Sequence, residues 1–186
     1  MGQVLGSGAG RRRHPGLSEA GGAGANETPP LELVVFIGLQ ASGKSAFYRG
    51  RFGATHGHVS KDSFRNNKNP NRRQRQLIKD AHGTGRSVVV DNTNPTAEER
   101  RSLVELGHEF GARIVGYYFE AEARECIERN RERRGKARVP NVAIYATAKK
   151  LVPPSRSEGF DELFRVGIVG DEDGFRIGSF SGDAEG

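Results

Sequence analysis

The clearest sign of the fold is the run Leu33-Val34-Val35-Phe36-Ile37-Gly38-Leu39-Gln40-Ala41-Ser42-Gly43-Lys44-Ser45. An apolar run of strand length ends at Gly38, and a Gly-Lys-Ser sequence begins at Gly43 after four intervening residues. This is the spacing of a P-loop, which joins a buried strand to a helix and binds nucleotide phosphates. The stretch therefore predicts a nucleotide site at the carboxyl end of a central strand.

Each part of the loop has a physical task. Gly38 and Gly43 permit positive φ and a close approach of the backbone, so that N–H groups of the loop can meet phosphate oxygens. The helix that follows adds its dipole. Lys44 is expected to reach the outer phosphates, and the Ser45 hydroxyl is placed to ligate a magnesium ion. The predicted residues for binding ATP are Gly38, Gln40, Ala41, Ser42, Gly43, Lys44 and Ser45.

The composition indicates one domain with tails at both ends. Residues 1–30 are rich in Gly and Ala around three arginines, and we expect them to be disordered. Residues 31–152 carry 23 Lys and Arg against 13 Asp and Glu, which is an excess of +10, whereas residues 153–186 carry −5. A basic domain suits an anionic ligand larger than one nucleotide, although such an excess is more often only a solvated surface.

Cysteine content and hydropathy limit the class further. A single cysteine, Cys126, excludes a disulfide framework within the chain, and this favours a cytosolic or nuclear compartment. Since nothing approaches the apolar length of a membrane span, we expect no membrane partner.

Apolar runs alternate with helical patterns along the chain. Strands are predicted at 33–38, around 58–60, and at 87–91, 113–119 and 162–169, with helices of ten or more residues between most of them. This alternation predicts an α/β fold of the P-loop NTPase class, a three-layer α/β/α sandwich with a parallel sheet of about five strands. The kinase-like domain would span residues 31–170, and residues 171–186 would form an acidic tail or a short hairpin.

Acidic side chains follow two further strands at the edge where ligands sit in such sheets. Asp62 precedes Arg65 by three residues, so the two share a face if a helix begins there. A carboxylate can take the proton of an attacking hydroxyl, and an arginine can hold the acceptor. A surface ion pair or a helix cap by Asp62 is an equally good interpretation.

Asp91 ends the strand 87–91 and has the form of a Walker B acid that orders the magnesium ion. The acid could instead orient the acceptor or cap the loop that follows. Asn94 and Pro95 are predicted as the N-cap and the first position of a helix over 95–110.

An arginine-rich stretch from Arg129 to Lys136 ends the helix predicted over 120–133. Its first part contains i,i+4 pairs typical of a solvated helix. The unpaired arginines beyond Glu132, followed by Gly135, favour a mobile lid over the ATP phosphates.

Taken together, these motifs resemble the kinase domain of polynucleotide kinase-phosphatases of phage and animals. The resemblance covers residues 32–169, and its most specific part is Asp91-Asn92-Thr93-Asn94-Pro95. It further includes Asp62-Ser63-Phe64-Arg65, the lid up to Val139-Pro140, and Glu158-Gly159-Phe160.

The resemblance implies a role for each matched position. Lys44 and Ser45 would serve ATP and Mg²⁺. Asp62 would be the general base for a 5′-hydroxyl, and Arg65 would contact the acceptor phosphate. The lid arginine is Arg134 if aligned by Gly135, or Arg133 if counted from Arg129.

Two departures qualify this assignment. The segment from Pro140 to Tyr145 is shorter than in the family, and there is no Asp-x-Asp-x-Thr phosphatase motif. The expected activity is ATP-dependent phosphorylation of the 5′-hydroxyl end of a nucleic acid in strand-break repair or RNA end healing. A separate 3′-phosphatase or a ligase is a candidate partner. Alternatives are a small-molecule P-loop kinase and a nucleotide-gated binding module.

Overall fold

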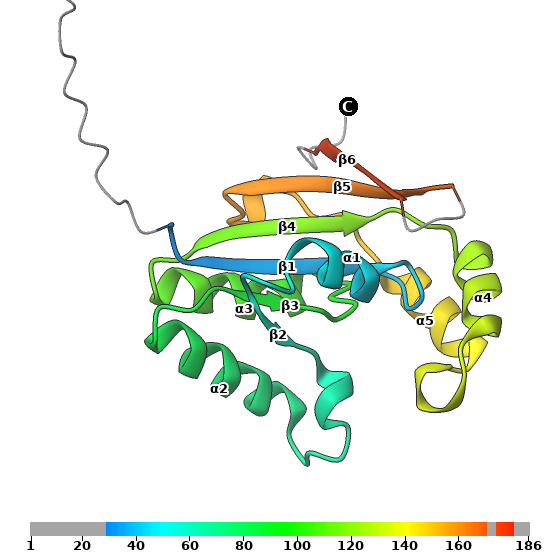
Figure 1. Cartoon of the computed structure of the whole chain (residues 1–186), viewed down its shortest axis with the longest axis horizontal. Coiled ribbons are helices and arrows are strands. Elements are labelled where there is room, and N and C mark those ends of the chain that lie inside the picture. The colour runs from blue at the N-terminus through cyan, green and yellow to red at the C-terminus, as the bar shows by residue number, and fades with distance from the viewer. Residues whose placement is uncertain (1–28, 171–173, 181–186) are drawn as a thin grey trace, which may run out of the picture.

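A six-stranded sheet forms the centre of the computed structural model, which describes residues 29–170 and 174–180. Its strand order is β2-β3-β1-β4-β5-β6. The first five strands are parallel, and β6 pairs antiparallel with β5 at one edge (Figure 1). The strands are β1 (Glu32–Gly38), β2 (Gly57–Val59), β3 (Val88–Val90), β4 (Arg113–Phe119), β5 (Glu162–Val169) and β6 (Gly174–Ser179).

Helices cover both faces of the sheet. In Figure 1, α1 lies on the near face, and α2 and α3 lie on the far face. The remaining two helices, α4 and α5, pack together beyond the ends of the strands, on the side of the P-loop. The helices are α1 (Lys44–Arg51), α2 (Pro70–Gly83), α3 (Ala97–Glu109), α4 (Ala123–Glu132) and α5 (Asn141–Lys150), with short 3₁₀ turns η1 (Lys61–Phe64), η2 (Gly135–Ala137) and η3 (Arg156–Glu158).

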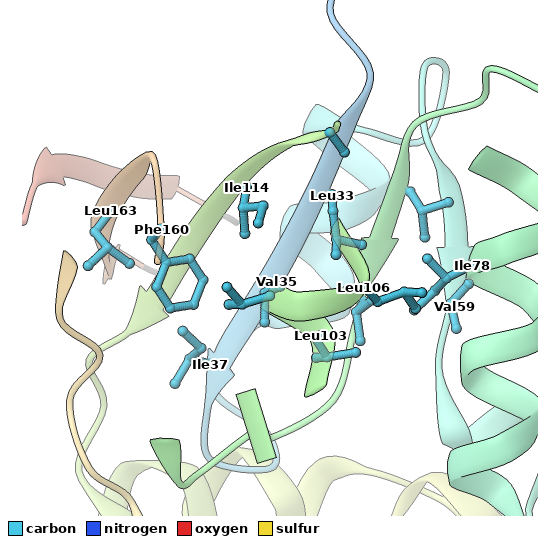
Figure 2. Close-up of a cluster of buried hydrophobic side chains, with 14 residues drawn as sticks. Leu33, Val35, Ile37, Val59, Ile78, Leu103, Leu106, Ile114, Phe160 and Leu163 are labelled. Carbon is cyan, nitrogen blue, oxygen red and sulfur yellow. The ribbon is translucent and has the colours of Figure 1, made fainter. Parts of the chain in front are cut away.

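Alternate residues of β1 fill the two sides of the core. Leu33, Val35 and Ile37 face the α2 and α3 side, where Figure 2 shows them with Ile78 of α2 and Leu106 of α3. The other face is mostly aromatic: the cluster there contains Phe36, Phe47, Phe52, Tyr117 and Phe119. A strand buried on both faces is a continuous apolar run, which explains why β1, β3 and β4 were readable from sequence.

The predicted fold class is confirmed, with one addition. The five expected parallel strands are present, and β6 adds a sixth that pairs antiparallel with β5. β6 lies within residues 171–186, which were predicted as an acidic tail or a short hairpin. The predicted disordered tail falls almost wholly on residues 1–28, outside the described residues. Among the helices that the structure describes, none combines the length and the apolarity that a membrane crossing requires.

Candidate active site

Three neighbouring strands deliver the candidate active-site segments. β1 leads into the P-loop, β2 into η1, and β3 into the loop after Val90, and these strands are adjacent in the order β2-β3-β1. Their carboxyl ends enclose a cleft of about 270 Å³. Its lining comprises Gln40, Ala41, Ser42, Lys44, Ser45, Ser60, Lys61, Asp62, Asp91, Asn92, Thr93, Asn94, Glu99, Arg133 and Val139.

The backbone of the P-loop bends through three residues with positive φ. Gly38 has φ 150°, Ala41 has φ 61° and Gly43 has φ 92°. A Cβ at Gly38 would lie 2.9 Å from both the Cβ and the carbonyl oxygen of Phe119, and one at Gly43 would lie 3.1 Å from the Phe175 ring. Space excludes a Cβ at Gly38, and the positive φ favours glycine at both positions. Both findings fit the roles predicted for the two glycines.

Lys44 begins α1, and its side chain folds back over the loop. Its ammonium group donates to the carbonyl oxygens of Gly38 (3.1 Å) and Leu39 and to the hydroxyl of Ser42 (3.2 Å). Burial lowers the pKa of Lys44 to about 8, although the nearby Asp91 carboxylate acts in the opposite direction. The lysine is thus a largely desolvated cation among phosphate-binding backbone groups, where an anionic ligand would be strongly attracted.

Ser45, Asp91 and His58 form a hydrogen-bonded group beside the lysine. The Ser45 hydroxyl donates to Oδ2 of Asp91 (2.7 Å), and Nε2 of His58 lies 3.0 Å from the same oxygen. Burial alone would raise the pKa of Asp91, but the hydrogen bonds from His58 and Ser45 and the charge of Lys44 together lower it. The acid is therefore held as a carboxylate, the form that can order a metal ion and its water.

These residues fit a magnesium ion bound together with ATP. Mg²⁺ in phosphate sites takes one or two protein oxygens and completes its shell with phosphate oxygens and water. A serine hydroxyl joined to a buried, ionised carboxylate is such a donor set. Among the described residues, no group of three or more His, Cys, Asp or Glu side chains offers a site made by the protein alone.

The segment from Asp91 to Pro95 makes hydrogen bonds to several neighbouring elements. The side chain of Asn92 accepts from the Lys61 N–H (2.9 Å) and donates to Gln74 (2.6 Å), so it connects η1 and α2 to the end of β3. The Thr93 carbonyl accepts from the N–H of Gly38 (3.0 Å). Asn92 and Thr93 thus connect η1, α2 and the P-loop at the end of β3.

The prediction that Asn94 caps the next helix is wrong. Asn94 is buried with φ 43°, and its side-chain amide donates to the Phe36 carbonyl at 2.7 Å. The helix begins later, and the hydroxyl of Thr96 caps it by accepting from the Glu99 N–H. The asparagine satisfies a carbonyl of β1 instead, because its short side chain tolerates positive φ and reaches the adjacent backbone.

Asp62 and Arg65 meet as their spacing predicted. The 3₁₀ turn η1 places the Arg65 guanidinium 2.8 Å from Oδ1 of Asp62. Asp62 lies on the rim of the cleft and is 76 % exposed. Arg65 also donates to the carbonyl of Lys136 (2.7 Å), so η1 and the residue after it contact the segment between α4 and α5.

The two candidate lid arginines differ in position. Arg133 lines the cleft, whereas Arg134 is exposed at the start of η2 and is absent from the cleft lining. Arg133, the lid arginine found by counting from Arg129, therefore fits this arrangement better than Arg134, the one found by alignment to Gly135. Asn130, which is fully buried, joins the two sides of the segment by pairing with the backbone of Val139 at 2.7 and 3.1 Å.

Two residues near the site, His58 and Arg100, were not singled out from sequence, and the contact of a third, Arg129, was not predicted. His58 contacts Asp91, as described above. Arg129 donates from Nε to the carbonyl of Ala41 in the P-loop (2.8 Å). Arg100 is fully buried, pairs in a bidentate manner with Glu158 (both distances 2.7 Å) and donates to the Asn94 carbonyl (3.0 Å). The contacts with Asp91, Glu158 and Ala41 join residues 33 to 88 positions apart, and no local pattern connects them.

The fold and the cleft define a P-loop NTPase-like protein. A family model described as an AAA domain matches residues 33–154, and the chain belongs to this family. The bifunctional polynucleotide phosphatase/kinase of Schizosaccharomyces pombe is 26% identical over 141 residues, which are 73% of this chain and 33% of that protein. The chain thus spans about a third of the length of this curated relative.

Solved structures share the fold at lower identity. A chain of the Pnkp1/Rnl/Hen1 RNA repair complex gives a TM-score of 0.57 at 23% identity and covers 68% of this chain and 46% of that one. A gluconokinase from Sinorhizobium meliloti 1021 gives a TM-score of 0.55 at 17% identity, and the match covers 76% of this chain and 85% of the gluconokinase. At such identities the likeness shows the fold alone.

Proposed function

We propose that this protein transfers the γ-phosphate of ATP to the 5′-hydroxyl end of a nucleic acid. The observation that carries the proposal is the position of Asp62 with Arg65 on the rim of the P-loop cleft. A P-loop alone binds phosphates, whereas an exposed carboxylate facing it supplies a base for an acceptor hydroxyl. The fission yeast relative, whose name includes polynucleotide kinase, supports this choice of acceptor.

The residues divide between the donor and acceptor sides of the reaction. Lys44 and the P-loop amides hold the ATP phosphates, and Arg133 approaches them from the lid. Asp62 accepts the proton of the hydroxyl as its oxygen attacks the γ-phosphorus, and the bond to the β,γ-bridging oxygen breaks to leave ADP. Magnesium, held at Ser45 and Asp91, would neutralise charge on the β- and γ-phosphates.

Arg65 and α2 give the acceptor side its positive charge. Arg65, beside Asp62, would contact the phosphate that follows the first nucleoside. Arg72 and Arg73 are exposed near the start of α2. Arg75 is less available than these two arginines, because its guanidinium donates to the Ser102 carbonyl of α3 (3.2 Å). A short acceptor path over Arg65 and the first turn of α2 follows from this arrangement.

The test is label transfer from γ-labelled ATP to a panel of acceptors. The panel contains a 5′-hydroxyl oligodeoxynucleotide, its RNA counterpart, nucleosides, gluconate and other sugars. We expect label only in the oligonucleotides. Label in a sugar or a nucleoside would identify a small-molecule kinase instead, and slow ATP hydrolysis without transfer would identify a nucleotide-gated binding module. A 3′-phosphatase or ligase acting on the same ends is a candidate partner on another chain.

A further inference from the structure

The P-loop contains an alanine in a conformation that alanine disfavours. Ala41 has φ 61°, and among the described residues only Ala41 and Asn94 combine a side chain with positive φ. Asparagine tolerates this region, but for alanine the contact of Cβ with the following carbonyl makes it unfavourable. Within the loop, the only backbone contact across Ala41 among the described residues is a long one, from the Ser42 N–H to the Leu39 carbonyl at 3.4 Å, so contacts from outside the loop add to the support of this conformation.

One side chain contacts the Ala41 carbonyl directly. Arg129, in the last turn of α4, donates from Nε to this oxygen at 2.8 Å. Its other contacts are weaker: Nη2 lies 3.6 Å from Sγ of Cys126 and 3.9 Å from Oε2 of Glu125, which is itself mostly exposed. The Ala41 carbonyl is thus the principal partner of this guanidinium.

The surrounding packing fixes the arginine and the loop relative to each other. Leu39 and Ala41 pack with Cys126 and Ile127 of α4 and with Ile144 of α5. The neighbouring Gln40 donates to the Thr147 hydroxyl of α5 (2.9 Å). The loop is therefore attached to both helices that border the lid, and Arg129 supplies the attachment at its strained residue.

We propose that Arg129 is a positioning residue for the phosphates: it holds Ala41 in its left-handed conformation and so keeps the P-loop amides directed into the cleft. It acts through the loop backbone and not by touching the nucleotide. The inference rests on the proposed nucleotide site but not on the acceptor, so it is testable without any phosphoryl transfer.

The test is calorimetric binding of ADP to four forms of the full chain. These are the unsubstituted protein, Arg129→Ala, Ala41→Gly and the double variant. Glycine adopts positive φ without a penalty, so in the Ala41→Gly background the loop conformation no longer depends on an external contact. Loss of Arg129 should weaken ADP binding by roughly five- to thirtyfold, which corresponds to the cost of the left-handed conformation for alanine.

The decisive comparison is the effect of Arg129→Ala in the two backgrounds. If Arg129 acts by holding Ala41, then in the Ala41→Gly background the Arg129→Ala substitution should raise the Kd for ADP by less than about threefold. An equal loss in both backgrounds would mean that Arg129 contacts the nucleotide directly, and this would overturn the proposal. An unchanged Kd in Arg129→Ala would overturn it as well.

Controls separate this result from general effects on the fold. Arg124→Ala removes an arginine of the same helix whose side chain is 87 % exposed and pairs only with Glu128, so ADP affinity should not change. Arg129 is itself one-third exposed, and its variant should unfold within a few degrees of the unsubstituted protein. If the unsubstituted protein bound no ADP, both this inference and the proposed function would fall, whereas the other contrary outcomes affect Arg129 alone.

Discussion

Lys44 should make nucleotide affinity depend on pH in a range where the phosphates are already ionised. Burial lowers its pKa from 10.5 to about 8 in the free protein. Only the protonated lysine neutralises phosphate charge, so affinity should fall as the pH rises through 8. Bound phosphates raise the pKa again because an opposite charge favours the ammonium form.

The size of the effect follows from the fraction of protonated lysine. With a pKa near 8, about nine tenths of the molecules carry the ammonium at pH 7 and about one tenth at pH 9. The Kd for ADP should therefore rise about tenfold over these two pH units, or about 1.4 kcal/mol. The second ionisation of a phosphate group lies near pH 6, and it contributes little in this range.

Calorimetric titration with ADP at constant ionic strength measures this dependence. Lys44→Met should bind weakly and with a Kd that hardly changes from pH 7 to pH 9. Lys61→Met removes another lysine of the cleft, one that is only half-buried, and should keep the tenfold change. A constant Kd in the unsubstituted protein would refute the reasoning, because the free lysine would then be charged throughout.

Three further outcomes follow. Asp62→Asn should lower the turnover number by roughly 10² to 10⁴, the usual contribution of a general base, while the Kd for ADP stays constant; an equal loss of ADP affinity would assign Asp62 to the metal or the fold. His82 is buried, with no hydrogen-bond partner for either ring nitrogen among the described residues, and burial lowers its pKa from 6.5. The unfolded chain therefore binds a proton more readily than the folded one. The free energy of unfolding should fall as the pH drops below 6.5, by up to about 1.4 kcal/mol per pH unit. Chemical denaturation should show this slope, and His82→Leu should reduce it. The Michaelis constant for a 5′-hydroxyl oligonucleotide should rise with salt with a log–log slope of about 1.5 to 3, against almost none for a substrate without a phosphate backbone.

Most of the fold could be predicted because its signals are local and strong. The limits predicted for β4 and β5 coincide with those of the structure, since most residues of each strand are apolar. β6 was not predicted as a strand of the main sheet. Its Phe175 and Ile177 alternate with polar residues or glycine over only six positions, and such a short pattern does not reveal its partner strand.

The candidate site was predictable where a residue acts through its place in a motif. Lys44, Ser45, Asp62 and Asp91 all line the predicted cleft. Asn94 was misplaced because a cap is inferred from the residues that follow it, whereas its partner is a carbonyl 58 residues earlier. The contacts of Arg129, Arg100 and His58 could not be predicted from sequence either, because each depends on how distant segments pack.

The central claim is that the acceptor is the 5′-hydroxyl of a nucleic acid. The most direct measurement compares two oligonucleotides that are identical except for a 5′-hydroxyl or a 5′-phosphate, each incubated with γ-labelled ATP and magnesium. We predict stoichiometric label on the 5′-terminal nucleotide of the hydroxyl form, almost none on the phosphate form, and loss of the label in Asp62→Asn. Equal labelling of both forms, or none in either while gluconate or a nucleoside is labelled, would contradict the assignment.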